Sequence, residues 1–420
     1  MEETVEAFRS LFSLLFLSFA AAFFLLALVL KALRSMPWWC SCPVCEAYVT
    51  KSWTAHFDNL CDWYAHLLRE SPTRTIHIHV LGNTVTANPD NVEHMLRARF
   101  DNYPKGKTFS AILGDLLGRG IFNVDGHLWR FQRKMAGAEL GSSAVRFFAS
   151  CIVADEVRGR FLPLLDVSSA DDKILDLQDV FRRFAFDNIC KISFGIDPGC
   201  LELSLPMSEF AAAFDKASRL SASRATSTMP MVWKAKRLLN RGSERELREA
   251  IGMVNLLANE LIRQRRKIGF SSNHDLLSRF MACVDDEKYL RDIIISFMLA
   301  GRDTVASLWG SDCHEFRPQR WLTNGAFTPE SPYKYPVFQG GLRVCLGKDM
   351  ALMEMKTVIV AVVRRFDIHV VDDGSSLPPK FAPGLTASLE GGLPVRVKRR
   401  DTSFPTQQLG ACSAQCSSIC

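Results

Sequence analysis

The stretch that decides the fold is Phe338–Lys356, FQGGLRVCLGKDMALMEMK, where one cysteine lies among glycines just before a long apolar run. Cys345 directly precedes the expected start of a helix, where free N–H groups and the helix dipole favour a thiolate over a thiol. Gly341 and Gly347 allow a tight loop with its backbone close to a large ligand. Arg343 can offer a fork of donors to a carboxylate. Together these residues suit a flat metal macrocycle that carries acidic side groups.

The apolar run after the loop, Met350–Val363, is hydrophobic on nearly every face, so we expect a helix buried in the middle of the domain. Zinc binding, a redox pair and nucleophilic catalysis are other uses of a cysteine such as Cys345. No partner cysteine is adjacent, however, and no histidine lies within twenty residues on either side.

The pattern Phe338-x-x-Gly341-x-Arg343-x-Cys345-x-Gly347 resembles the haem-binding loop of the cytochrome P-450 monooxygenases. The resemblance implies a mainly α-helical fold with small β-sheets. It also implies haem b as the cofactor, with Cys345 as the iron ligand whose electron donation favours O–O cleavage.

Two further segments resemble elements of the same family. The run from Trp129 to Arg133 resembles its Trp-x-x-x-Arg element, which implies that these two side chains and Arg343 contact the haem propionates. Ala300–Thr304, AGRDT, resembles the oxygen-activating turn of the distal helix and implies a proton relay by Asp303 and Thr304. A Trp and an Arg four apart also simply stack on many helices, and a glycine also ends ordinary helices.

A segment of the family pattern is missing. The stretch Phe316–Trp321 resembles the aromatic-Pro-x-Arg element, but no Glu-x-x-Arg lies between Thr304 and Cys345. Glu260-x-x-Arg263 precedes the distal helix, so we interpret it as a chance match. Arg320 resembles the arginine that pairs with the missing element, and an unpaired buried charge costs about 3–5 kcal/mol. We therefore predict an incomplete fold with an internal deletion near residues 307–308.

The N-terminal segment Leu11–Leu30 contains twenty residues, of which only two serines are polar, enough to span a bilayer as a helix. Lys31 and Arg34 follow it, so the positive-inside rule keeps the rest of the chain in the cytosol. A cleaved signal peptide is the alternative. We expect an uncleaved transmembrane helix in the endoplasmic-reticulum membrane, with the catalytic domain cytosolic.

The remaining sequence gives the domain limits and the partners. We expect an anchor over residues 1–31, a haem-thiolate domain over 32–400 and a disordered tail over 401–420. The net charge of +6 is mild, so no nucleic-acid partner is expected.

Residues 100–134 are similar to the plant fatty-acid hydroxylase group, which implies a small lipophilic substrate, either a fatty acid or a jasmonoyl-amino-acid conjugate. The family also implies an NADPH-cytochrome reductase as electron donor. A catalytically inactive family member without stable haem is the alternative.

Three cysteines form a tight CSCPVC motif just after the expected anchor, at Cys40, Cys42 and Cys45. Cysteines on the cytosolic side should be reduced. No neighbouring Cys-x-x-Cys or His pair supplies a fourth zinc ligand, so we interpret these residues as unliganded thiols, with acylation as another use. His77 and His79 follow in a predicted β-hairpin and are interpreted as part of a solvated strand face.

Overall fold

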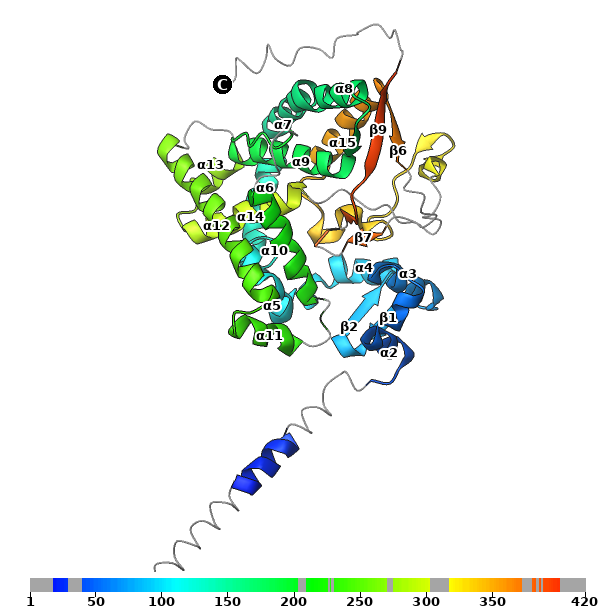
Figure 1. Ribbon diagram of the computed structural model, residues 1–420, viewed down its shortest axis with the longest axis vertical. Coiled ribbons are helices and arrows are strands. Elements are labelled where there is room, and N and C mark those ends of the chain that lie inside the picture. Colours follow the sequence, from blue (N-terminus) through cyan, green and yellow to red (C-terminus); the bar gives the residue numbers. More distant parts are fainter. Residues whose placement is uncertain are drawn as a thin grey trace, which may run out of the picture. The chain divides into compact units, whose positions relative to one another are not determined.

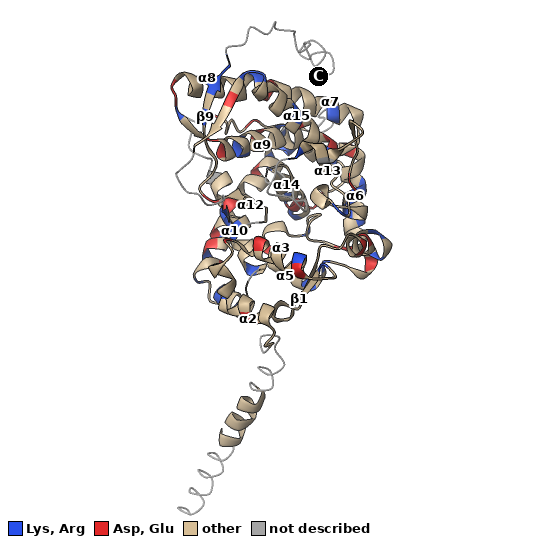
Figure 2. Ribbon diagram, turned by 90° about the vertical axis from the view of Figure 1, so that its right-hand side faces the viewer, with Lys and Arg blue, Asp and Glu red and all other residues tan. Residues whose placement is uncertain are grey.

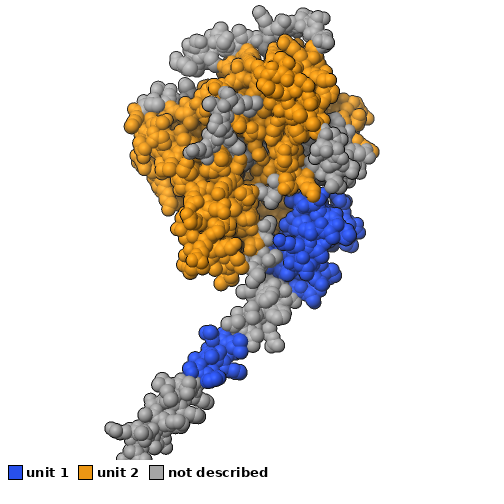
Figure 3. Space-filling view, in the orientation of Figure 1, with its two compact units in different colours: residues 1–88 blue, residues 89–420 orange. Residues whose placement is uncertain are grey.

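The computed structural model describes residues 18–28, 40–202, 209–225, 227, 230–269, 275–302, 317–371, 380–382, 385–386 and 388–400. They belong to two compact units, residues 1–88 and 89–420 (Figure 3). The described residues are mainly helical with small antiparallel sheets, as the sequence predicts (Figure 1).

The first unit combines short helices with one β-hairpin. Its elements are α2 (Pro43–Thr50), η2 (Ser52–Ala55), α3 (Leu60–Glu70), β1 (Thr75–Ile78), η3 (His79–Leu81) and β2 (Asn83–Thr86). The predicted hairpin is confirmed: Ile76 pairs with Val85, and Gly82 turns the chain at φ +62°. Its small core contains six buried side chains, Cys45, Tyr48, Trp63, Ile76, Ile78 and Val80.

The predicted anchor, Leu11–Leu30, lies largely outside the described residues. Residues 18–28 are helical and exposed. Within the part of the chain that the structure describes, no helix has the length and apolar character needed to cross a membrane. The predicted tail, residues 401–420, also lies outside the described residues.

The second unit contains most of the helices. They are α4 (Pro89–Glu93), η4 (His94–Ala98), η5 (Phe100–Asn102), α5 (Gly106–Leu117), α6 (Gly126–Leu140), α7 (Ser143–Glu156), η6 (Val157–Phe161), α8 (Leu162–Ala170), α9 (Leu177–Phe194), α10 (Glu209–Ala225), α11 (Pro230–Leu238), α12 (Ser243–Ile268), α13 (Leu276–Met281), α14 (Glu287–Arg302), η7 (Pro318–Trp321), η8 (Pro336–Phe338), η9 (Gly341–Arg343) and α15 (Lys348–Val363).

The strands of this unit form three small sheets among the described residues. They are β3 (Ile174–Asp176), β4 (Leu322–Thr323), β5 (Ala326–Phe327), β6 (Phe366–Val370), β7 (Phe381–Ala382), β8 (Ser388–Leu389) and β9 (Pro394–Arg399). The largest sheet has the order β3-β9-β6, so the last of its three strands along the sequence lies between the other two.

Two hydrophobic cores hold the second unit together. The larger core gathers side chains of α5, α9, α10, α12 and α14, among them the fully buried Leu290, Ile294 and Met298. The smaller core joins α7, α8 and α9 to the β3-β9-β6 sheet. Because α9 contributes to both cores, it connects the helical bundle to the sheet. Local signals fix its ends: the Asp176 carboxylate accepts N–H bonds at the start, and Gly195 adopts φ +62° at the end.

The prediction of a buried helix after the cysteine loop was wrong. In α15 the side chain of Val358 is buried, whereas Ile359, Val360 and Val363 are 58%, 52% and 52% exposed. One side of α15 packs on the smaller core through Met353 and its neighbours. Within the described part of the chain, no element covers the opposite side. A helix that is apolar all round is buried only when neighbours surround it.

Basic and acidic residues are interspersed along the ribbon rather than separated (Figure 2). Several form local networks. The Asp197 carboxylate, for example, lies 2.7 Å from the Arg160 guanidinium and 3.1 Å from the Lys191 ammonium. These two cations lower the pKa of Asp197 to about 2, with the Arg160 hydrogen bond as the largest cause. The net charge of +6 follows separately from the composition, 51 Lys and Arg against 45 Asp and Glu.

Candidate functional site

The cysteine loop is closed by its own backbone. The N–H of Cys345 donates to the carbonyl oxygen of Phe338 over 2.8 Å. Gly341 adopts φ +55°, and a Cβ atom there would collide with the carbonyl oxygen of Leu96. This glycine is therefore required both by its backbone conformation and by the close approach of η4. Gly347 is different, because its φ is ordinary and nothing lies within 4 Å of a Cβ built on it.

Burial of the Cys345 sulfur works against the thiolate that the start of α15 would favour. Part of the Cys345 side chain is exposed, but protein atoms around the sulfur displace water and raise the pKa of the thiol above its ordinary value. The Gly347 N–H and the charges of Arg133 and Lys348 act in the opposite direction and are outweighed. A raised pKa does not oppose metal ligation, because a bound metal ion deprotonates a coordinating thiol outright.

The Arg343 guanidinium lies among aromatic rings and next to a carboxylate. It is 5.0 Å from the ring centre of Trp129 and 4.9 Å from that of Phe100. Its Nη2 lies 3.2 Å from Oδ1 of Asp125. Sequence reasoning missed Asp125 and Phe100. The available signal for Asp125 was its position as the residue before α6, where aspartate is common.

Arg133 connects α6 to the cysteine loop. Its guanidinium donates to the carbonyl oxygen of Val344 over 2.8 Å and lies 5.7 Å from the ring centre of Trp129. Burial lowers the pKa of Arg133, and the nearby Arg343 lowers it further, whereas Cys345 raises it. The structure therefore brings together Trp129, Arg133, Arg343 and Cys345, which the sequence places in two segments about 200 residues apart.

Lys105 is a further cation that sequence reasoning missed. Its ammonium donates to the carbonyl oxygen of Phe122. Burial, followed by the positive charge of Arg343, lowers the pKa of Lys105 to about 8, while Asp125 partly raises it. The Asp125 carboxylate also accepts the Gly106 N–H over 3.0 Å. Its pKa is lowered overall: burial raises it, but backbone N–H groups and Arg343 act in the opposite direction.

The donor set of this cluster fits haem. The cluster contains three cations, Lys105, Arg133 and Arg343, which are close enough to interact electrostatically with one another or with the Cys345 sulfur. The Asp125 carboxylate offsets part of their positive charge. The surplus of positive charge suits two propionate groups, which bidentate arginine donors recognise well. The cysteine supplies the soft ligand that an iron macrocycle takes in this position.

The predicted distal residues are described only in part. Gly301 is the second-last residue of α14, and a Cβ there would approach the side chain of Ile189 on α9 to 2.5 Å. The glycine therefore allows close packing of α14 on α9. Asp303 and Thr304 lie outside the described residues, as does Phe316, and nothing is described of the Arg320 side chain.

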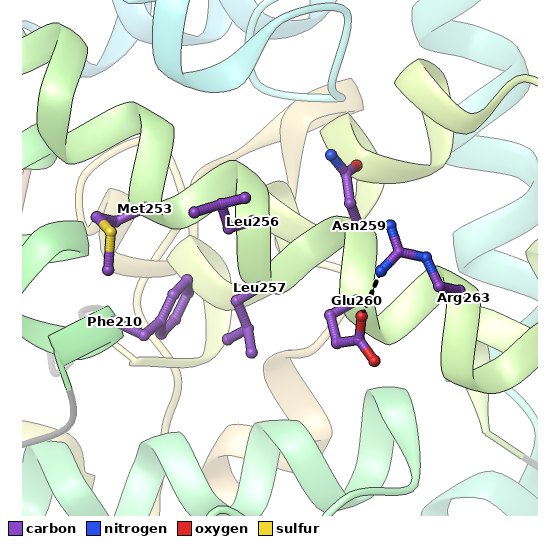
Figure 4. Close-up of a pocket in the computed structure, with 7 residues that line it drawn as sticks. All are labelled: Phe210, Met253, Leu256, Leu257, Asn259, Glu260 and Arg263. Carbon is purple, nitrogen blue, oxygen red and sulfur yellow. Dashed lines mark hydrogen bonds and ion pairs between the residues drawn. The ribbon is translucent and has the colours of Figure 1, made fainter.

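Glu260 and Arg263 form a surface ion pair. They lie one turn apart on α12, with 2.7 Å between carboxylate and guanidinium and with both side chains exposed. Together they line part of a pocket of about 480 Å³ between α10 and α12, with Phe210, Met253, Leu256, Leu257 and Asn259 (Figure 4). No residue of the cysteine loop lines this pocket. The pair is an ordinary helical contact, which agrees with its interpretation as a chance match.

Comparison with known proteins decides the family. The cytochrome P450 family model matches residues 53–310 and 307–391. The chain belongs to the cytochrome P450 family. It is 47% identical to cytochrome P450 94C1 of Arabidopsis thaliana, over 86% of this chain and 94% of the relative. It is 37% identical to cytochrome P450 94B3 of the same plant and 33% identical to cytochrome P450 94A1 of Vicia sativa, each over more than four-fifths of both chains.

A solved structure confirms the cytochrome P450 fold. The crystal structure of the cytochrome P450DA heme domain matches with a TM-score of 0.63 at 16% identity, over 82% of this chain and 94% of that chain. Family membership makes the chain an oxidoreductase of the monooxygenase type whose cofactor is haem.

The matches also have an interruption. The two parts of the family match meet at residues 307–310. The alignment with the 94C1 relative has 464 positions. It includes 86% of the 420 residues of this chain, or about 361 residues. About 100 positions of the alignment are therefore gaps in this chain.

Proposed function

We propose that this chain is built to oxidise a lipid-like substrate, inserting one oxygen atom of O₂ into a C–H bond near the end of a fatty acid or a jasmonoyl conjugate. The other oxygen atom leaves as water, using two electrons from NADPH delivered through a cytochrome reductase. Bound haem supplies the activation of dioxygen. The observation that carries the proposal is the cluster of Cys345 with Arg133 and Arg343. The substrate class rests on the resemblance of residues 100–134 and on the similarity to the 94-series relatives.

The residues of this chain have separate parts in that function. Cys345 would ligate iron. Arg133 and Arg343 would hold the propionates. The Trp129 ring, which contacts both guanidinium groups, would keep them beside the cysteine loop. Asp303 and Thr304 would pass protons to the oxygen site, a role that rests on sequence resemblance.

The membrane and the electron donor complete the proposal. The apolar segment Leu11–Leu30 and the cations that follow it support an anchor in the endoplasmic-reticulum membrane with the catalytic domain in the cytosol. Protease added to intact microsomes should then digest the second unit, and protection of that unit would contradict this orientation. Lys348, exposed beside the cysteine loop, and Arg130 are candidate contacts for the acidic surface of a reductase.

We also propose that a family segment is missing near residues 307–308. The interrupted family match and the alignment gap support this deletion. So does the uncovered apolar side of α15, whose Ile359 and Val363 side chains are more than half exposed. A helix with this composition normally packs against neighbours on more than one side.

The uncovered side of α15 favours a second candidate function: a family member that keeps the helices without retaining haem stably. Reduced protein treated with carbon monoxide distinguishes the two. Thiolate-ligated haem gives a red-shifted Soret band, which Cys345→Ala should abolish. We expect a weak band from the chain as it stands and a strong band after a relative's segment is inserted between Ser307 and Leu308. No band from either chain would overturn the haem-site assignment, and a strong band with turnover from the unaltered chain would overturn the second candidate.

A further inference from the structure

The first unit brings four metal-ligating side chains to one point. Three are the cysteines of the CSCPVC motif: Cys40, then Cys42 directly before α2, and Cys45 in its first turn. The fourth is His79, which follows β1 and begins η3. The interpretation of these cysteines as lacking a fourth ligand was wrong, because the histidine comes from a segment 34 to 39 residues away.

The distances match those of one bound ion. Nδ1 of His79 lies 3.4, 3.7 and 3.8 Å from the sulfurs of Cys40, Cys42 and Cys45. All four ligand atoms lie within 4.8 Å of one another. In a tetrahedral zinc site, Zn–S bonds of about 2.3 Å and a Zn–N bond of about 2.0–2.1 Å separate sulfur from nitrogen by about 3.6 Å. The observed distances bracket this value.

Hydrogen bonding alone does not account for this arrangement. One imidazole nitrogen faces three sulfurs, but it carries at most one proton and sulfur is a weak partner. A cation accepts all four ligands at once. His77, on the same hairpin, shows the ordinary alternative: its Nδ1 lies 2.9 Å from the Thr84 hydroxyl on the paired strand.

We infer that Cys40, Cys42, Cys45 and His79 form a structural zinc site. Three thiolates and an imidazole select a borderline-soft ion over calcium or magnesium, which take oxygen ligands. Four protein ligands fill a tetrahedral shell, so the site has a structural rather than a catalytic character. The site also lies where a bound metal ion would stabilise the unit. Cys45 belongs to the six-residue core, and so do Ile78 and Val80 on either side of His79. The ion would therefore join α2 to the hairpin in a unit that has only a small hydrophobic core.

The test uses the full-length chain, purified without added metal and without chelators. Elemental analysis should find about one zinc ion per chain, independent of its iron content. X-ray absorption at the zinc edge should give three sulfur ligands at about 2.3 Å and one nitrogen at about 2.0–2.1 Å. Because neither measurement depends on haem, failure here is distinct from failure of the monooxygenase proposal.

Matched variants locate the ligands. His79→Ala should lower the zinc affinity by at least about 100-fold, more than the roughly 10–100-fold effect of losing a supporting partner. Cys42→Ser should do the same. His77→Ala and Cys61→Ser are the controls, since His77 is bonded to Thr84 and Cys61 is an exposed free thiol outside the cluster. Both should keep the zinc.

Thiol labelling keeps the inference testable even if a variant fails to fold. In the unaltered chain, bound zinc should protect Cys40, Cys42 and Cys45 from alkylation, while Cys61 reacts, and a chelator should expose the three. Absence of zinc after dialysis against micromolar zinc, or equal alkylation of all four cysteines with and without zinc, would overturn the site. A zinc spectrum with only sulfur ligands, or zinc retention by His79→Ala, would remove His79 from it.

Discussion

The guanidinium of Arg133 donates a hydrogen bond to the carbonyl oxygen of Val344, the residue before Cys345, over 2.8 Å. This bond joins α6 to the cysteine loop across 211 residues of sequence. It places a positive charge near the Cys345 sulfur and fixes the loop in the conformation that presents that sulfur. Arg133 therefore acts on both the charge and the shape of the site.

Arg133→Ala should weaken haem retention roughly 10–100-fold, because a hydrogen bond from a charged donor is worth about 1.5–3 kcal/mol. Competition for haem with apomyoglobin measures the change, in whichever chain, unaltered or segment-restored, binds haem. Arg130→Ala is the matched control, since Arg130 lies on the same helix but pairs with Asp101. Equal losses in both variants would show that Arg133 contributes only general positive charge.

Substituting the two loop glycines should have unequal effects. Gly341→Ala forces φ +55° on a residue with a side chain and drives its Cβ against the Leu96 carbonyl. We expect a loss of about 1–3 kcal/mol in the free energy of unfolding. Gly347→Ala meets no neighbour and should stay within about 0.5 kcal/mol. Urea unfolding of the haem-free chain measures both, and similar midpoints would contradict the loop geometry.

Glu354 should make stability fall as the pH rises. Burial raises the pKa of Glu354 from 4.5 to about 7, and the Asn188 amide, 3.2 Å away, lowers it in part. Between these two values the folded protein binds more protons than the unfolded chain, so stability decreases through this window and the whole loss is present above about pH 7. One pKa unit corresponds to about 1.4 kcal/mol, so the full loss is on the order of 3 kcal/mol.

Glu354→Gln removes this dependence, because the amide cannot ionise and still offers an oxygen to Asn188. The variant should match the unaltered chain near pH 4.5 and unfold at a higher temperature at pH 8. Asp349→Asn, at an exposed carboxylate on the same helix, is the control and should show no such gain. If Glu354→Gln is equally or less stable at pH 8, the carboxylate is not buried as described.

The exposed side of α15 gives a test of the missing segment. Replacing Ile359 and Val363 by glutamine should change stability by less than about 0.5 kcal/mol each in the chain as it stands, because both side chains face water. In the segment-restored chain the same changes should destabilise by about 1–3 kcal/mol each, since both positions would then be covered. Val358→Ala is the control and should destabilise both chains, because Val358 already packs in the smaller core of the present chain. Equal effects of the glutamine substitutions in the two chains would refute the coverage argument.

Local signals in the sequence predicted much of the fold. The hairpin that contains His77 and the mainly helical fold with small sheets were both predicted. The cysteine loop was identified because its glycines, arginine and cysteine lie within ten residues of one another.

Contacts between distant segments could not be predicted in this way. Asp125 and Lys105 interact with Arg343, which is more than 200 residues away in sequence. His79 contacts three cysteines that precede the hairpin. The exposure of α15 and the raised pKa of Cys345 could not be predicted for the same reason. Both depend on which atoms pack around these residues in the folded chain, and the local sequence does not specify those atoms.

The position of β9 has a consequence for biosynthesis. In the β3-β9-β6 sheet, Leu175 pairs with Val395 and Ile368 with Val397, and β9 is the neighbour of both other strands. The ribosome makes this central strand last, so the sheet and the smaller core beneath it cannot assemble while translation continues. Until Pro394–Arg399 emerges, β3 and β6 have no central strand to pair with, and the Phe366 side chain, fully buried in the folded chain, has no complete core to enter. Chaperone engagement should therefore persist to the end of synthesis, and a stop codon before residue 394 should direct the product to degradation rather than to a shortened but folded protein.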